Sequence, residues 1–290
     1  MSNLCITDVR VQPGDAAFLL DDGETAILYD TGFGFTGFAV ADKVKALLGT
    51  RPLDYIFLTH SHYDHALGSA YIKKRYPNAV VVAGEYAAKI FQKPTAKAVM
   101  RELDQKFAKS CGVFSYEDLA DELQVDLPVS DGSKICAGKM TFEVVNLPGH
   151  TKCSVGYYCA EHQLLLGSET IGVFNGADDV VPSYLVGVQL ALDSIARVKE
   201  LDIQQILVPH YGILNHEETA LYLKRAEERA KSVAEAIANQ LQEGKTIETI
   251  LAWFKDEFYH GYIKTIYPID AMELNTHIMI ELVKKELLQK

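Results

Sequence analysis

The chain has 290 residues, and 48% of them are hydrophobic, so it can bury a large core. Its length is near the upper limit for a single domain. Its formal net charge of -11 argues against a general binder of nucleic acids or anionic membranes, because such proteins recruit phosphates with basic patches. The five cysteines are an odd number without CxxC pairs, which is typical of free thiols in a reducing compartment. We therefore expect a cytoplasmic protein with a small-molecule partner, and neither nucleic acid nor membrane as a partner.

The first third of the chain alternates short apolar runs with segments of helical spacing. The predicted elements are, in order, a hairpin of strands 16–20 and 25–30, a helix 38–48, a strand 55–59, a helix 65–76 and a strand 79–83. The last three form a βαβ-like unit, which is typical of an α/β sheet. Because such sheets bind ligands beyond the carboxyl ends of their strands, a site is expected just after residue 59.

The remaining segments divide into a helical stretch, a second β-rich block and a helical C-terminus. Residues 85–123 read as a mostly helical insertion. The later predicted elements are strands 140–146, 154–159 and 163–167, a helix 183–200, a strand 205–209, and helices 217–242, 246–258 and 272–288. No linker rich in Pro, Gly or Ser precedes the last helices. We therefore predict a main domain over residues 1–216 and a C-terminal helical extension over residues 217–290 that packs on it.

The stretch "THSHYDHALG", Thr59 to Gly68, has three histidines and an aspartate within six residues at the end of a predicted strand. Neutral imidazole is the commonest metal ligand, and His60 and His62, two residues apart, can converge on one ion. Asp64 and His65, at the start of a helix, can face a second ion nearby. The alternative is a surface loop of hydrogen-bonded polar residues, but such a density of imidazoles at a strand end favours metal binding.

This HxHxDH pattern resembles the signature of the metallo-β-lactamase superfamily. Three further motifs follow in the superfamily's order: "LPGHT" at Leu147–Thr151, "LLGSETIG" at Leu165–Gly172 and "LVPHYG" at Leu207–Gly212. The resemblance implies an α/β fold, the four-layer αββα sandwich, here with a helical insertion and a helical C-terminal extension. It also implies a first metal bound by His60, His62 and His150, a second metal bound by Asp64, His65 and His210, and an acid, Glu169, that bridges them.

Two positions depart from the superfamily's usual pattern. The bridging acid is usually an aspartate in a motif of the form "LFxGD", whereas Glu169 is one methylene longer. The alternative for Glu169 is a capping or surface carboxylate. The last motif is usually Pro-x-His-Gly, whereas "PHYG" places His210 one position earlier and Tyr211 where the histidine would stand. Tyr211 is therefore the competing candidate at the second metal, and the filling of both metal sites is left open.

The resemblance implies two divalent metal ions, and nitrogen and oxygen ligands suit zinc, manganese or iron, with zinc as our first choice. Such ions lower the pKa of bound water towards about 7. We expect a hydrolase in which a metal-bound hydroxide, oriented by Asp64 as the catalytic residue, attacks the carbonyl of a small ester, thioester or lactone. Tyr63, between the ligands, and Tyr211 are candidates for substrate binding, and packing is the alternative for Tyr63.

Two other classes of function stay open. Flavodiiron proteins share this fold and carry an HxExDH variant with two irons, so a diiron or mono-iron oxidoreductase is one alternative. In this chain His62 stands at the glutamate position. A regulatory protein with secondary hydrolase activity is the other, because the insertion, the "GSETIGVF" stretch and the C-terminal helices resemble the quinolone-signal response thioesterase. The aromatic segment 250–263 either roofs the site or packs on the main domain or on a second copy in a homodimer.

Overall fold

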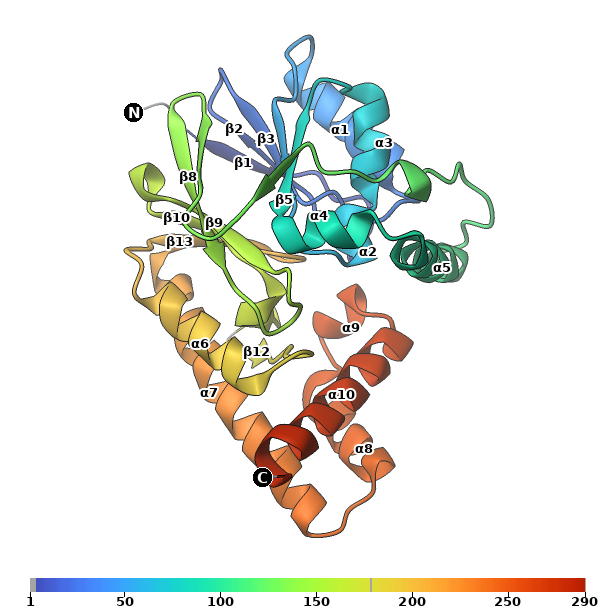
Figure 1. The fold of residues 1–290 in the computed structure, drawn as a ribbon, viewed down its shortest axis with the longest axis vertical. Helices are drawn as coiled ribbons and strands as arrows, with labels where there is room; N and C mark the ends of the chain where they lie inside the picture. The colour runs from blue at the N-terminus through green and yellow to red at the C-terminus, as the bar shows by residue number, and fades with distance from the viewer. Residues whose placement is uncertain (1–3, 178, 290) are drawn as a thin grey trace. The chain divides into compact units, whose positions relative to one another are not determined.

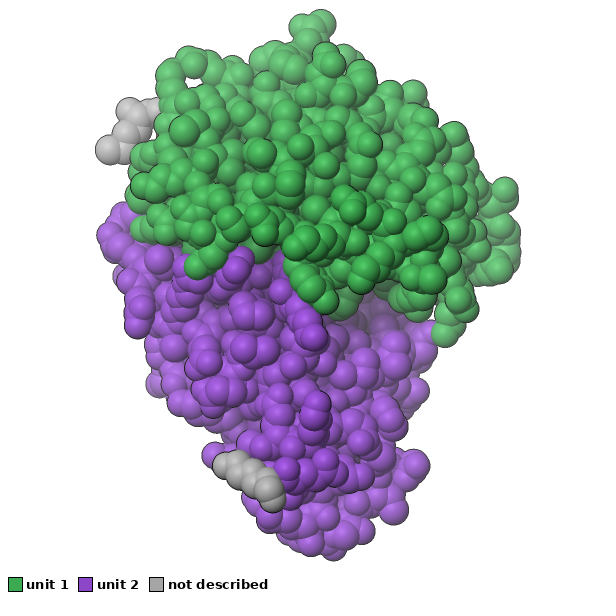
Figure 2. Space-filling view, in the orientation of Figure 1, with its two compact units in different colours: residues 1–145, 155–162 green, residues 146–154, 163–290 purple. Residues whose placement is uncertain are grey.

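The computed structural model describes residues 4–177 and 179–289 and separates the chain into two compact units. Unit 1 comprises residues 1–145 and 155–162, and unit 2 comprises residues 146–154 and 163–290 (Figure 2). The predicted boundary after residue 216 lies inside unit 2 and stays a prediction. No helix within the described residues combines the length and apolar character that a bilayer span requires.

Unit 1 contains a six-stranded sheet in the sequential order β1 to β6. Its strands are β1 (Cys5–Asp8), β2 (Phe18–Asp21), β3 (Ala26–Tyr29), β4 (Tyr55–Phe57), β5 (Val80–Gly84) and β6 (Leu127–Val129). The first three pair antiparallel, and β4, β5 and β6 continue parallel to β3. All four residues of β3 are buried, as expected for a strand that is covered on both faces. The predicted βαβ-like unit is therefore part of this sheet.

A second group of strands in unit 1 packs face to face on this sheet. β7 (Lys134–Ala137), β8 (Met140–Asn146) and β9 (Val155–Cys159) lie side by side, with β7 and β8 antiparallel. Phe57 of β4 contacts Phe142 of β8 and Tyr157 of β9, with ring centroids 5.2 and 4.6 Å apart. The Tyr157 hydroxyl also donates a hydrogen bond to the Leu58 carbonyl at 2.7 Å. These contacts fix the end of β4, where the histidine-rich segment begins.

The helices of unit 1 follow the predicted pattern with two differences. They are α1 (Gly37–Leu48), α2 (Tyr63–Ala66), α3 (Gly68–Arg75), α4 (Glu85–Phe91) and α5 (Pro94–Ser110) (Figure 1). The single helix predicted over 65–76 is two helices that meet at Leu67. The insertion predicted as helical over 85–123 is helical only to Ser110. Gly112 has φ +81, a backbone conformation outside the α-helical region, and only a 3₁₀ turn, Ala120–Glu122, follows.

Unit 2 contains a three-stranded group, a small hairpin and the C-terminal helices. Its strands are β10 (Leu164–Leu166), β11 (Val173–Phe174), β12 (Val180–Val181), β13 (Gln205–Val208) and β14 (Gly212–Leu214). β13 pairs parallel with β10 and antiparallel with β14, and β11 pairs antiparallel with β12. The helices are α6 (Val188–Lys199), α7 (His216–Gln242), α8 (Ile247–Phe258), α9 (Ile263–Ile266) and α10 (Ile269–Val283).

The C-terminal helices share a hydrophobic core with the segment 173–191. Within unit 2, α10 packs against both α8 and α7 (Figure 1). Phe254, Phe258 and Met279 are at most 3% exposed in this core. On the other side it includes Val173 and Val181 of the β11–β12 hairpin, Tyr184, and Val188 at the start of α6. The aromatic surface predicted over 250–263 is thus covered by residues of unit 2.

Candidate metal centre

Unit 1 brings together the four residues of the HxHxDH motif. The loop after β4 and the first turn of α2 carry them, with His60 and His65 buried and His62 and Asp64 half-buried. The ring centroid of His60 lies 4.6 Å from that of His62 and 4.1 Å from that of His65. The Nε2 atom of His65 lies 3.8 Å from Oδ2 of Asp64. The group is compact because only a short loop separates the end of β4 from the start of α2.

Two buried polar residues of unit 1 orient these imidazoles. Asp30, at the end of β3, accepts hydrogen bonds from the Thr59 amide at 2.8 Å and the Thr59 hydroxyl at 2.9 Å. Its Oδ2 also lies 2.8 Å from Nδ1 of His65. Because the Thr59 proton is given to Asp30, its 3.0 Å contact with Nδ1 of His60 requires that imidazole to donate. In both histidines Nδ1 therefore carries the proton, and Nε2 carries the lone pair that a metal needs.

The loop that carries His150 in unit 2 is held tightly against its neighbours. Gly149 has φ +146, and a Cβ there would lie 2.7 Å from the Ala191 Cα, so the close approach requires glycine. Nδ1 of His150 lies 3.0 Å from the Ser183 carbonyl oxygen and 2.8 Å from its hydroxyl. A carbonyl only accepts, so Nδ1 donates and Nε2 again carries the lone pair.

Glu169 directs one carboxylate oxygen to each of two histidines in unit 2. It begins the 3₁₀ turn after β10, and it is only 2% exposed. Its Oε2 lies 2.9 Å from Nε2 of His150, and its Oε1 lies 3.4 Å from Nε2 of His210. A carboxylate in this position can reach two separate ions. The alternative of a surface carboxylate does not fit this burial.

The turn between β13 and β14 directs His210, rather than Tyr211, towards Glu169. His210 has φ +63, a left-handed conformation that is uncommon outside glycine but several-fold enriched in histidine. Tyr211 instead packs between Phe174 and Tyr262, with ring centroids 4.6 and 5.5 Å away. Tyr63 packs on Phe33 in unit 1, with centroids 5.6 Å apart. Neither contact tests the substrate-binding roles predicted for the two tyrosines.

Several partners of the ligand residues were not predicted. Asp30 could have been found, because it is the last residue of a predicted strand, next to the edge where the histidines follow theirs. Ser183 was placed in a predicted helix. Tyr267 donates its hydroxyl proton to Oε1 of Glu169, and Tyr262 donates to the carbonyl oxygen of His210. These tyrosines lie in the C-terminal segment, where the sequence shows no ligand motif.

The donor set in each unit fits divalent metal ions. In unit 1 the candidate ligand atoms of His60 and His62, and those of Asp64 and His65, lie within 4.8 Å of one another. In unit 2 the same holds for His150 and Glu169. Imidazole nitrogens and carboxylate oxygens are ligands of zinc, iron and manganese.

Comparison with known proteins agrees with the motifs. Residues 14–210 match the family model of the metallo-β-lactamase superfamily. The chain is 32% identical over 146 residues to glyoxylase B2 of Dictyostelium discoideum, a match that covers 50% of this chain and 45% of that protein. It is 26% identical over 144 residues to a hydroxyacylglutathione hydrolase of Stenotrophomonas maltophilia (strain R551-3), which covers 50% of this chain and 41% of that protein.

The crystal structure of a metallo-β-lactamase family protein from Thermus thermophilus has the same fold. It matches with a TM-score of 0.64 at 21% identity, over 98% of this chain and 93% of that one. The chain therefore belongs to the metallo-β-lactamase superfamily. This confirms the predicted fold class, an α/β αββα sandwich with additional helices. The chain spans about half the length of the two curated relatives described above.

Proposed function

We propose that the protein is a metal-dependent hydrolase of small thioesters, with esters and lactones as further substrates. The observation that supports this proposal most is the pair of contacts from Glu169, whose two oxygens face His150 and His210 in unit 2. Superfamily membership supports the proposal, and the curated relatives include hydroxyacylglutathione hydrolases, whose name describes a thioester substrate.

The ligand sets that we propose follow the superfamily's pattern. As the superfamily's pattern implies, His60, His62 and His150 would hold the first ion, Asp64, His65 and His210 would hold the second, and Glu169 would supply a carboxylate to both. When bound, such ions supply an activated water and polarise the substrate carbonyl. Asp64 would orient the attacking water, while Asp30, Thr59 and Ser183 keep the histidines in the tautomer that binds metal. We propose zinc as the metal, with iron or manganese as alternatives.

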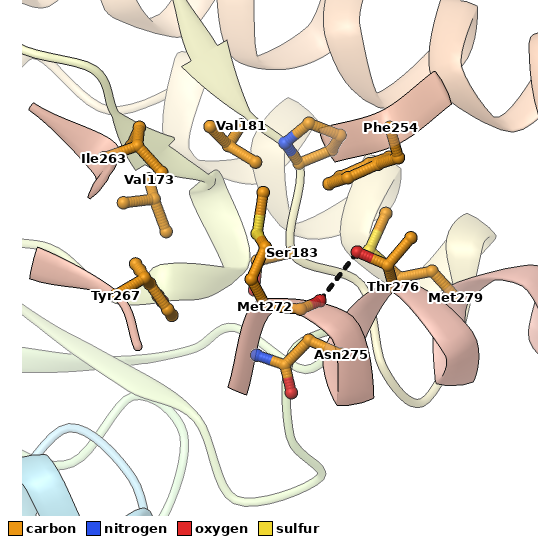
Figure 3. A pocket seen from close by; sticks show the side chains of 11 residues that line it. Val173, Val181, Ser183, Phe254, Ile263, Tyr267, Met272, Asn275, Thr276 and Met279 are labelled. Carbon is orange, nitrogen blue, oxygen red and sulfur yellow. Dashed lines mark hydrogen bonds between the residues drawn. The ribbon is translucent and has the colours of Figure 1, made fainter. Parts of the chain in front are cut away.

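A small apolar pocket in unit 2 supports a short apolar acyl group as part of the substrate. It is lined by Val173, Val181, Pro182, Ser183, Phe254, Ile263, Tyr267, Met272, Asn275, Thr276 and Met279. Figure 3 shows these side chains converging from β11, β12 and the C-terminal helices. Ser183 and Tyr267 belong both to this wall and to the contacts with His150 and Glu169. A chain held here would therefore have its polar end near ligand residues.

The proposal is tested by metal analysis and a substrate panel. Protein purified without chelator is expected to contain up to two divalent ions and to hydrolyse thioesters of short apolar acids. His60→Ala should lose metal and activity, because the first ion then lacks one of its three histidines. His162→Ala, which alters an imidazole outside the motifs, is the matched control. Metal-loaded protein that cleaves no thioester, ester or lactone would refute the proposal, and iron with redox-dependent absorbance would favour the oxidoreductase instead.

A further inference from the structure

The segment between α8 and α10 reaches the ligand residues of unit 2. Tyr267 lies between α9 and α10, and its hydroxyl donates to Oε1 of Glu169. Its ring stands edge-on to His210, with centroids 6.0 Å apart and planes at 64°. Tyr262, at the start of α9, donates to the carbonyl oxygen of His210. Two tyrosines of one short segment thus contact two of the three candidate ligands in unit 2.

Tyr267 is itself held in place by its own segment. Its amide donates to the Ile263 carbonyl oxygen at 3.0 Å, and its carbonyl oxygen accepts from the Tyr259 hydroxyl at 3.0 Å. The ring forms part of the wall of the apolar pocket (Figure 3). The direction of the hydroxyl is therefore set by backbone contacts and packing, and does not depend on Glu169 alone.

A glutamate at the bridging position needs such a partner more than an aspartate does. Its side chain has one more rotatable bond, and fixing a side chain of this kind costs up to about 2 kcal/mol of conformational entropy. A phenol that donates to Oε1 fixes the last torsion. It uses one lone pair of Oε1 and leaves Oε2, together with the second lone pair of Oε1, for other partners.

We propose that Tyr267 is a positioning residue for Glu169. The C-terminal segment 259–267 thereby helps to orient the candidate metal ligands of unit 2. The inference rests on the proposed function, since it assumes that Glu169 binds metal. Glu169 stands where the superfamily usually has an aspartate, and its side chain is longer. Tyr267 holds the two carboxylate oxygens of Glu169 towards His150 and His210. Tyr262 fixes the left-handed turn at His210 in the same way.

The test compares Tyr267→Phe with Tyr184→Phe. Both changes remove one phenolic oxygen from the same core, and the Tyr184 hydroxyl has no hydrogen-bond partner among the described residues. Metal affinity is measured by competition with a chelator, together with thermal unfolding of the apoprotein. Tyr267→Phe is expected to weaken binding of one of two ions about 10- to 100-fold, as loss of a partner behind a ligand commonly does. Tyr184→Phe is expected to bind both ions like the wild type.

A double-mutant cycle with Glu169→Gln separates positioning from packing. If Tyr267 acts through the carboxylate, the double variant should bind metal less than about twofold more weakly than Glu169→Gln alone. Full multiplication of the two effects, or a Tyr267→Phe variant as tight as Tyr184→Phe, would overturn the inference. In that case a wild type that binds two ions and cleaves thioesters leaves the proposed function standing. A wild type that binds no metal would overturn both.

Discussion

Among the residues around the candidate ligands of unit 1, Asp30 links three segments of the chain. It joins the end of β3 to the end of β4 through Thr59 and to α2 through His65, and it is fully buried with φ +51. A non-glycine residue in that backbone conformation is uncommon, and such strain is concentrated at functional sites. The three hydrogen bonds that it accepts compensate for burying its carboxylate.

Asp30→Asn is expected to lower metal affinity about 10- to 100-fold while leaving the fold intact. An amide can satisfy Thr59 or His65 in one orientation only, so the His65 tautomer is no longer fixed. Chelator competition and circular dichroism measure the two effects. Asp54→Asn is the control, because Asp54 accepts from the Ala26 amide in the same sheet but contacts no ligand. Equal affinities of the two variants would show that Asp30 supports the fold alone.

The register of the "PHYG" motif gives a second test at the residue scale. His210→Ala should lower the metal content of the protein from two ions to one, because Nε2 of His210 faces Glu169. Tyr211→Phe should retain both ions, since its ring packs on Phe174 and Tyr262 and the substitution keeps that ring. Elemental analysis of both variants decides between them. Loss of an ion in Tyr211→Phe alone would assign the second metal to Tyr211.

At the scale of helices and strands, the sequence predicted the long and strongly patterned elements well. The strand expected over 140–146 is β8, and the helix expected over 217–242 is α7 with one residue added. The helix expected over 183–200 begins only at Val188. The residues before it hold the loop of His150 in place. The Ser183 carbonyl and hydroxyl contact the imidazole. The amides of Leu185 and Val186 donate to the Gly149 carbonyl. β11 and β12 have two residues each, too few for a period to show.

The candidate ligands could be predicted from the sequence because they stand in short motifs, where spacing within a few residues carries the information. The hydrogen-bond partners of these ligands do not stand in such motifs. His65 and Asp30 are 35 residues apart, His150 and Ser183 are 33 apart, and Glu169 and Tyr267 are 98 apart. Such pairs are made by packing of distant elements, which periodicity and turn signals do not encode.

The pocket beneath α10 leads to a prediction about substrate length. Met279→Trp should fill the pocket and lower kcat/KM for acyl chains that enter it relative to the shortest substrate, by about fourfold for each methylene that no longer enters. Leu274→Trp is the matched control, because Leu274 lies on the same helix and is 54% exposed. The ratio of kcat/KM for long and short acyl chains is the measurement, and activity on the shortest substrate reports folding. An unchanged ratio in Met279→Trp would place the acyl group elsewhere.

Helix α5 gives a prediction about pH. Asp104 on α5 accepts from the amides of Gly34 and Phe35 at 2.8 and 3.2 Å, and from the Tyr116 hydroxyl. Burial raises the pKa of Asp104 to about 6, although these hydrogen bonds oppose the shift. Because this pKa lies above the ordinary value of 3.8, the folded state holds more protons between these values. The contribution of Asp104 to the free energy of unfolding therefore falls as pH rises through that window, by up to about 3 kcal/mol.

Asp104→Asn removes this titration, so its free energy of unfolding should depend less on pH between about 4 and 6 than that of the wild type. Urea unfolding at several pH values gives the slope. Asp118→Asn is the control, since Asp118 is a partly exposed carboxylate paired with Arg101. The idea fails if Asp104→Asn and Asp118→Asn show the same slope.

At the scale of the whole molecule, the candidate ligands are divided between two units with separate sets of buried residues. Unit 1 carries the HxHxDH motif on a core that includes Phe57 and Phe142. Unit 2 carries His150, Glu169 and His210, and its core joins the β11–β12 hairpin to the C-terminal helices. The C-terminal helices therefore support ligand residues through the core as well as through Tyr262 and Tyr267. Removing residues 246–290 would expose this core, so point substitutions test the connection better than truncation.

Phe254→Ala and Phe142→Ala form a matched pair for this test. Both rings are at most 1% exposed, Phe254 in the core of unit 2 and Phe142 against Phe57 in the core of unit 1. Each substitution should cost about 3–5 kcal/mol, because it leaves a cavity in a packed core. We expect amide exchange to rise mainly in unit 2 for Phe254→Ala and mainly in unit 1 for Phe142→Ala, since each loss of packing acts first on its own core.

Mass spectrometry of exchanged peptides locates the change, and metal content is measured on the same samples. Phe254→Ala should lose the ion proposed at His210 at temperatures where the unit 1 peptides are still protected. Equal loss of protection across both units in the two variants would show that the chain unfolds as one cooperative body, in which case the C-terminal helices stabilise the whole molecule rather than the ligands of unit 2.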